Sequence, residues 1–155
     1  MTLYLIRHAK AEKDAKSGRD FDRKLSEKGR KQAKKLGELL KDTIPENTRF
    51  FCSSAKRTRE TITLAELSNE VHFLDELYLA SETKLVQFVN ALNAEHPICL
   101  IGHNEGISEL ASYFTGQTIE LRTSEFIVLR FPFESSAYWS QETAQIDFQG
   151  RPEVD

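Results

Sequence analysis

Short runs of apolar residues recur along the chain and predict the strands of a buried sheet. The two most apolar runs are residues 3–6 and 98–101. Uninterrupted runs of this length are typical of strands that are covered on both faces. Four further strands are expected at residues 49–52, 71–74, 126–131 and 144–148. The last of these alternates apolar and polar positions, which is typical of a half-buried strand.

Apolar residues at helical spacing lie between these runs and predict four amphipathic helices. The first helix follows Ser26, which can act as its N-cap. We expect Ser53 or Ser54 to cap the second helix, which should run to about residue 67. The other two helices are expected at about residues 82–93 and after residues 102–106. This alternation predicts an α/β fold with a mostly parallel central sheet flanked by helices.

The composition fits one globular domain that spans residues 1–155. Hydrophobic residues make up 39% of the chain and charged residues 29%, which is ordinary for a soluble domain. The net charge of −3 gives no electrostatic reason to expect nucleic acid as a partner. No apolar stretch is long enough to span a membrane, and the N-terminus lacks a signal-peptide pattern. Cys52 and Cys99 form no Cys-x-x-Cys motif, so we expect buried free thiols and a cytoplasmic protein.

Arginines and histidines stand where three of the predicted strands end. Arg7 and His8 follow the first strand, at the start of a long polar loop. Arg57 lies in the first turn of the second helix, and His103 precedes the fourth helix. Each residue taken alone can be an ordinary surface or turn residue. Carboxyl ends of parallel strands, however, meet at one sheet edge, where α/β proteins usually bind ligands.

Two guanidinium groups and two imidazoles at one edge suit a phosphoryl group. Arginine forks match phosphate oxygens, and the free N–H groups of a helix N-terminus also favour anions. An imidazole nitrogen beside such a group can attack phosphorus and form a phosphoenzyme. The sequence therefore predicts a pocket for a dianionic phosphoryl group.

Four short motifs resemble those of the histidine phosphatase (phosphoglycerate mutase-like) superfamily and occur in the same order. They are LIRHA at residues 5–9, DRKLSEKG at 22–29 followed by QA at 32–33, SSAKR at 53–57 followed by Thr61, and GHN at 102–104. Four ordered motifs are far more specific than one Arg-His pair. The last strands and Trp139 also resemble the short SixA branch, the phosphohistidine phosphatases. The resemblance implies a three-layer α/β sandwich without a large cap domain.

The resemblance also implies roles for the candidate residues. His8 would be the nucleophile, attacking as neutral imidazole while a backbone carbonyl holds its other ring nitrogen. Which nitrogen attacks is left open. Arg7, Arg57 and His103 would bind the phosphoryl oxygens. Arg59 is an alternative to Arg57, since both lie in the first turns of the same helix.

Arg23 is a further candidate for phosphate contact, and no metal or cofactor is expected. The two imidazoles lack carboxylate or thiolate ligands at the usual spacing of a metal site. We therefore expect a metal-independent phosphatase. Glu105, close to His103 and Asn104, places a negative charge where relatives often have an apolar residue or proline, and could restrict the anion site.

The loop before the third helix bears on the substrate. Relatives that cleave phosphate esters usually carry a proton-donating acid there, because an alkoxide is a poor leaving group. Here the middle of that loop, residues 77–81, contains no acid, although Asp75, Glu76 and Glu82 flank it. A phosphoramidate P–N bond needs less acid help. A chain of 155 residues also leaves little room for a cap, so an open pocket could admit a histidine displayed on another protein.

The sequence thus predicts a protein phosphohistidine phosphatase that acts on a signalling or phosphorelay protein through an intermediate on His8. One alternative is a small phosphomonoesterase acting on a sugar or nucleotide phosphate, with Asp75 or Glu76 as the general acid. The other alternative is a non-catalytic phosphate-binding module.

Overall fold

The computed structural model describes residues 1–154, which form one six-stranded sheet in the order β3-β2-β4-β1-β5-β6. The strands are β1 Thr2–Arg7, β2 Arg49–Ser53, β3 Val71–Leu74, β4 Ile98–Gly102, β5 Phe126–Arg130 and β6 Gln145–Gly150. The first four are parallel to one another, whereas β5 and β6 are antiparallel to their neighbours. The mostly parallel sheet is therefore confirmed, with its antiparallel part at one edge.

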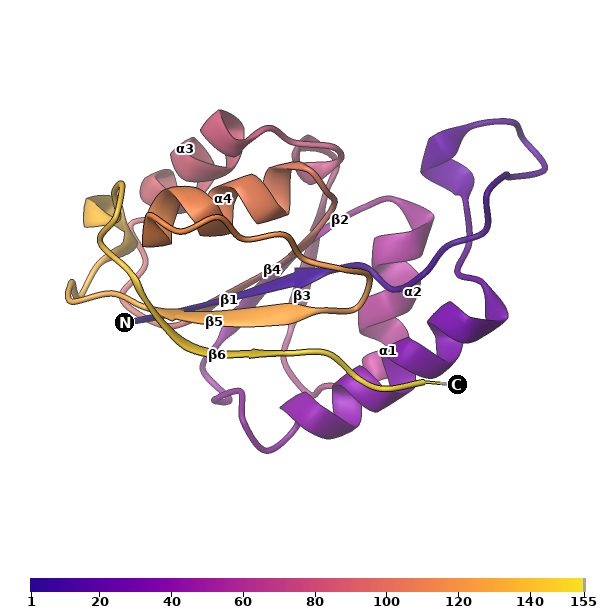
Figure 1. The fold of residues 1–155 in the computed structure, drawn as a ribbon, viewed down its shortest axis with the longest axis horizontal. Coiled ribbons are helices and arrows are strands. Elements are labelled where there is room, and N and C mark those ends of the chain that lie inside the picture. Colours follow the sequence, from indigo (N-terminus) through magenta and orange to yellow (C-terminus); the bar gives the residue numbers. More distant parts are fainter. Residues whose placement is uncertain (155) are drawn as a thin grey trace.

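Helices cover both faces of this sheet. They are α1 Glu27–Leu40, α2 Lys56–Ala65, α3 Glu82–Leu92 and α4 Gly106–Thr115, with three short 3-10 helices, η1 Asp20–Asp22, η2 Asp75–Leu77 and η3 Ser136–Tyr138. Figure 1 shows α3 and α4 over one face of the sheet and α1 and α2 against the other. The three-layer α/β sandwich is thus confirmed. None of the helices within residues 1–154 is long and apolar enough to cross a membrane.

The central strand β1 is buried on both faces because successive side chains point in opposite directions. Leu3 and Leu5 join the core cluster beneath α3 and α4. Tyr4 and Ile6 join the cluster on the side of α1 and α2. The uninterrupted apolar run of this strand therefore serves two cores at once.

The register of the sheet brings distant parts of the sequence together at its carboxyl edge. Arg7 at the end of β1 is paired with Gly102 at the end of β4. His8 and His103 each follow these paired residues directly, and the His8 backbone N–H donates to the Gly102 carbonyl (3.1 Å). Strand pairing alone therefore sets the two imidazoles side by side.

Helix α1 holds the segment that follows His8. Its Gly29 lies so close to the backbone of Lys10 that an added Cβ would stand 1.9 Å from the Lys10 carbonyl oxygen. At Gly37 the corresponding distance to the Ala65 carbonyl oxygen is also 1.9 Å. These two glycines let α1 pack directly against the Lys10 backbone and against α2.

The second helix begins later than the sequence suggests. Neither Ser53 nor Ser54 caps it, since Ala55 occupies the N-cap position without a side-chain hydrogen bond. The Ser53 hydroxyl faces His103 instead, and the Ser54 hydroxyl donates to Asp75. The expected cap was wrong because both hydroxyls have partners beyond their own helix.

The last two strands also differ slightly from the prediction. β5 ends at Arg130, since Pro132, two residues later, has no N–H to donate to a neighbouring strand. Phe131 then stacks on Trp139, which is buried in the core, with 4.1 Å between ring centroids. β6 continues to Gly150, beyond the predicted end.

Candidate active site

His8 is a buried imidazole whose tautomer is set by the backbone. Its side chain lies at the end of β1, and the residue is 8% exposed. Its Nδ1 lies 2.7 Å from the carbonyl oxygen of Ala9. Because a carbonyl only accepts, Nδ1 carries the hydrogen and Nε2 keeps the free lone pair. The Ala9 N–H in turn donates to the Thr61 hydroxyl (3.0 Å), which fixes this turn against α2.

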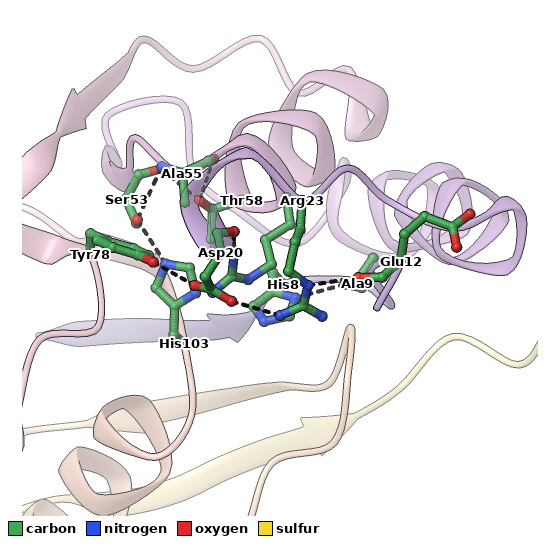
Figure 2. A network of polar contacts seen from close by, with 11 residues as sticks. His8, Ala9, Glu12, Asp20, Arg23, Ser53, Ala55, Thr58, Tyr78 and His103 are labelled. Carbon is green, nitrogen blue, oxygen red and sulfur yellow. Dashed lines mark hydrogen bonds and ion pairs between the residues drawn. The ribbon is translucent and has the colours of Figure 1, made fainter. Parts of the chain in front are cut away.

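His103 lies beside His8, with 5.3 Å between the ring centroids. Its Nε2 contacts the Ser53 hydroxyl at 2.8 Å, while its Nδ1 is buried without a partner. The His103 ring also lies nearly perpendicular to the ring of Tyr78, at 5.5 Å between centroids. Figure 2 shows His103 between Ser53, Tyr78 and the neighbouring His8.

Of the two candidate arginines in α2, Arg57 faces the site and Arg59 does not. The side chain of Arg57 is 3% exposed. Arg59 is exposed and lies over the ring of Phe73 on the outermost strand β3, at 4.4 Å from its centroid. Residues two apart in an α-helix point about 200° apart, so only one of the pair can face the imidazoles.

Arg7 and Arg23 approach the same region from different elements. Arg7 donates to the carbonyl of Leu121 at 3.0 Å, and its Nε is buried. Arg23 is held at the rim, where it donates to the carbonyl of Glu12 (2.7 Å) and to the carboxylate of Asp20 (2.8 Å). All four principal candidates therefore gather at the sheet edge, with Arg23 in an outer position.

Three buried nitrogens of this group have no hydrogen-bond partner within residues 1–154. They are Nε of Arg7, Nε of Arg57 and Nδ1 of His103. A buried polar atom left unpaired costs about 1–3 kcal/mol. An oxyanion that accepts from the guanidinium groups would remove part of this cost. The arrangement is thus suited to a phosphoryl group.

Asp20 and Tyr78 complete the site and were not found by sequence reasoning. The Asp20 carboxylate, on η1, accepts from the Tyr78 hydroxyl, from Arg23 and from Arg57. Partial burial raises the pKa of Asp20, but these three hydrogen bonds outweigh it and hold the pKa well below the usual range. The carboxylate is therefore ionised at neutral pH. The one available signal was the spacing of Asp20 and Arg23, which form an i,i+3 ion pair.

The carboxylates flanking the loop before α3 do not gather at the imidazoles. Asp75 is exposed and accepts from the Ser54 hydroxyl, and Glu76 is exposed as well. Glu82 lies in the first turn of α3. Tyr78 of this loop lies against one of the imidazoles, that of His103. Within residues 1–154, no group of three or more His, Cys, Asp or Glu side chains is arranged to hold a metal ion.

Both imidazoles are neutral at physiological pH. Burial lowers the pKa of His8 to about 4, and the charges of Arg57 and Arg7 add to this decrease, while the bond to Ala9 opposes it. Burial, followed by the proximity of His8 and Arg57, lowers the pKa of His103 to about 3. His8 can therefore act as a nucleophile without first losing a proton.

Protein stability should fall on acidification because of these imidazoles. The pKa of His8 is lower in the folded state than its ordinary value of 6.5, so the unfolded chain binds more protons between about pH 6.5 and 4. Linkage then predicts that His8 alone costs ~2 kcal/mol of unfolding free energy between pH 7 and pH 5. Urea unfolding at the two pH values would measure this effect. The decrease in unfolding free energy from pH 7 to pH 5 should be smaller by about that amount in His8→Asn than in the unaltered protein. Equal losses in both proteins would contradict the neutral imidazole.

Comparisons with known proteins give matches to one family model and to a relative. Residues 3–78 match the family model of the histidine phosphatase superfamily (branch 1). The uncharacterized protein ML1117 of Mycobacterium leprae is 30% identical over 114 residues, which are 73% of this chain and 71% of that protein.

Solved structures of similar fold include phosphatases with different substrates. A structure described as the phosphohistidine phosphatase SixA of Nakamurella multipartitia has a TM-score of 0.87 and 25% identity, over 99% of this chain and 96% of that one. The α-ribazole phosphatase of Shigella flexneri has a TM-score of 0.73 and 16% identity over the whole of both chains. At that identity the second similarity shows the fold alone.

Proposed function

Because the chain belongs to the histidine phosphatase superfamily and is a phosphatase, we propose that it removes phosphoryl groups from histidine residues of another protein. The substrate would be a signalling or phosphorelay protein that displays its phosphohistidine at the open edge of the sheet. Its phosphoryl group would bind among Arg7, Arg57 and His103. The buried, unpaired nitrogens of these three side chains support this placement.

The first chemical step would transfer the phosphoryl group to His8. Nε2 of His8, which holds the free lone pair, would attack phosphorus while the P–N bond to the substrate histidine breaks. The Ala9 carbonyl would stabilise the positive charge that develops on the His8 ring, since it accepts from Nδ1–H. The guanidinium groups would hold the oxygens of the transferring group, on which the charge is spread.

The second step would return the enzyme to its starting state. Water would attack phosphorus of the phosphorylated His8, the new P–N bond would break, and orthophosphate would leave. The substrate imidazole released in the first step takes up a proton from solvent or keeps one already present on its other nitrogen. No group of the enzyme is consumed, and the two steps together add one water across the P–N bond.

The three hydrogen bonds that the Asp20 carboxylate accepts, from Arg23, Arg57 and the Tyr78 hydroxyl, favour phosphohistidine over a phosphate ester. This carboxylate contacts the phosphate-binding arginine, and its pKa is lowered. It therefore cannot donate a proton to an alkoxide at neutral pH. An imidazole leaves without such help more readily than an alkoxide does. The likeness to the Nakamurella SixA structure across nearly the full chain supports the same substrate class.

A small phosphomonoesterase is the second candidate. The α-ribazole phosphatase of Shigella flexneri shares the fold over its whole length, so the scaffold accommodates ester substrates. Against it, Asp75 and Glu76 are exposed, and the Asp75 carboxylate accepts from the Ser54 hydroxyl. The presence of two imidazoles and two arginines together argues against a non-catalytic phosphate-binding module.

A substrate panel tests the proposal. Purified protein should release orthophosphate from a histidine-phosphorylated phosphotransfer domain with a kcat/KM at least about 10²-fold above that for sugar phosphates and nucleotides, because the esters lack the general acid they require. The phosphorylated domain without enzyme is the control, since phosphohistidine also hydrolyses spontaneously. Rapid cleavage of a sugar phosphate beside an untouched phosphohistidine domain would overturn the substrate assignment.

A further inference from the structure

The long loop between β1 and α1 delivers one carboxylate to the arginine of α2. Residues 12–14 and 16–20 of this loop are exposed, yet Asp20 reaches the buried Arg57. One terminal nitrogen of Arg57 donates to the Asp20 backbone carbonyl at 2.9 Å. The other donates to the Asp20 carboxylate at 3.0 Å. A single loop residue therefore binds both ends of the guanidinium fork.

These two contacts leave the Nε side of the Arg57 guanidinium unpaired. Its Nε is buried and has no partner within residues 1–154. A guanidinium carries five N–H groups in a fixed plane, so clamping both terminal nitrogens fixes the direction of Nε–H as well. The free edge is thus held in one orientation before any ligand binds. Fixing donors in advance increases their benefit for a charged ligand, because no reorganisation is needed on binding.

Asp20 itself is held by two further donors. Arg23 donates to one carboxylate oxygen (2.8 Å), and the Tyr78 hydroxyl donates to the oxygen that Arg57 also contacts. Figure 2 shows Asp20 between Tyr78 and Arg23. The ring of Tyr78 in turn lies 5.5 Å from that of His103. The Asp20 carboxylate therefore connects Arg57 to Tyr78, whose ring lies beside His103.

We propose that Asp20 is a positioning residue, which orients the Arg57 guanidinium so that its free edge binds a phosphoryl oxygen. In this role the carboxylate remains in place when an oxyanion binds. In the alternative role, the carboxylate competes with phosphate for Arg57 and must move away before an oxyanion can bind. The two roles predict opposite effects of removing the carboxylate.

Orthophosphate binding distinguishes them without any turnover, so the test stands apart from the identity of the substrate. Calorimetric titration of Asp20→Ala with orthophosphate should give a Kd raised about tenfold, because a charge-assisted bond that orients Arg57 is lost. Tighter binding in this variant would identify a competitor and overturn the proposal. A destabilised variant raises the apparent Kd only by the inverse of its folded fraction, so a tenfold effect from instability would require about nine tenths of the protein to be unfolded. Thermal unfolding of Asp20→Ala, measured beside the titration, should show a folded protein at the titration temperature.

A double-mutant cycle shows whether Asp20 acts through Arg57. In an Arg57→Ala background, Asp20→Ala should change the Kd of orthophosphate by less than about twofold, since the residue that it orients is absent. A tenfold change in the Kd of orthophosphate in that background as well would show that Asp20 does not act through Arg57 and would overturn the proposal. Asp22→Ala is the matched control, because Asp22 lies on the same 3-10 helix but pairs with Arg19 at the surface (2.9 Å). This variant should bind orthophosphate like the unaltered protein.

Discussion

Replacement of His8 by asparagine should lower turnover by roughly 10⁴-fold or more, because it removes the nitrogen that forms the covalent intermediate. Asparagine keeps a polar group of similar reach but offers no nucleophilic lone pair on nitrogen. In the unaltered protein Nε2 is free and neutral, so nothing else is needed to activate it. Single-turnover reactions with a ³²P-labelled phosphohistidine domain, quenched in alkali, should trap labelled enzyme only when His8 is present.

The His8 variant must still bind oxyanions for this result to be informative. Arg7, Arg57 and His103 are unchanged in it, so orthophosphate should bind within a few-fold of the unaltered protein. Turnover that persists at the normal rate, or label that still becomes attached to the variant, would remove His8 from its proposed role.

Replacement of Arg57 by alanine should lower kcat/KM by about 10³-fold, because the charge that develops on the phosphoryl oxygens loses a preorganised donor. The side chain is buried, and its loss also leaves the Asp20 carboxylate with fewer partners. Steady-state kinetics on the phosphohistidine domain would measure the effect. Part of the loss should appear in kcat, since the interaction strengthens as the P–N bond breaks.

Arg59→Ala provides the matched control for this experiment. It removes the same charge from the same helix, but Arg59 lies over Phe73 and away from the imidazoles. Its kcat/KM should remain within about threefold of the unaltered protein, as expected for an exposed charge. If the larger loss occurred in Arg59→Ala, the assignment of the two arginines would have to be reversed.

The sequence predicts most of the sheet because its strands are apolar on both faces. The apolar run at residues 3–6 is buried on both faces of the sheet, in one core beneath α3 and α4 and in another beneath α1 and α2. It also predicts that Arg7, His8 and His103 lie near one another, since parallel strands place their carboxyl ends together. Pairing of Arg7 with Gly102 confirms that this edge is shared.

Other features of the site depend on geometry that no local pattern carries. Which of Arg57 and Arg59 faces the imidazoles depends on the phase of α2, and an error of two residues would exchange them. Ser53 has the sequence context of a helix cap, yet its hydroxyl contacts His103 from another strand. Asp20 lies within a long polar loop, where its spacing from Arg23 gives no signal that it also binds the distant Arg57. Such contacts become visible only when the chain is folded.

The central position of β1 has a consequence for how the polypeptide is made. Leu3 is synthesised well before both of its sheet partners, Ile98 and Leu129. Until then one of the most hydrophobic segments of the nascent chain has no strand on either side, and unpaired strands of this kind are prone to aggregate. The nascent segment would thus stay open to aggregation until Leu129 has been synthesised and β5 can pair with it.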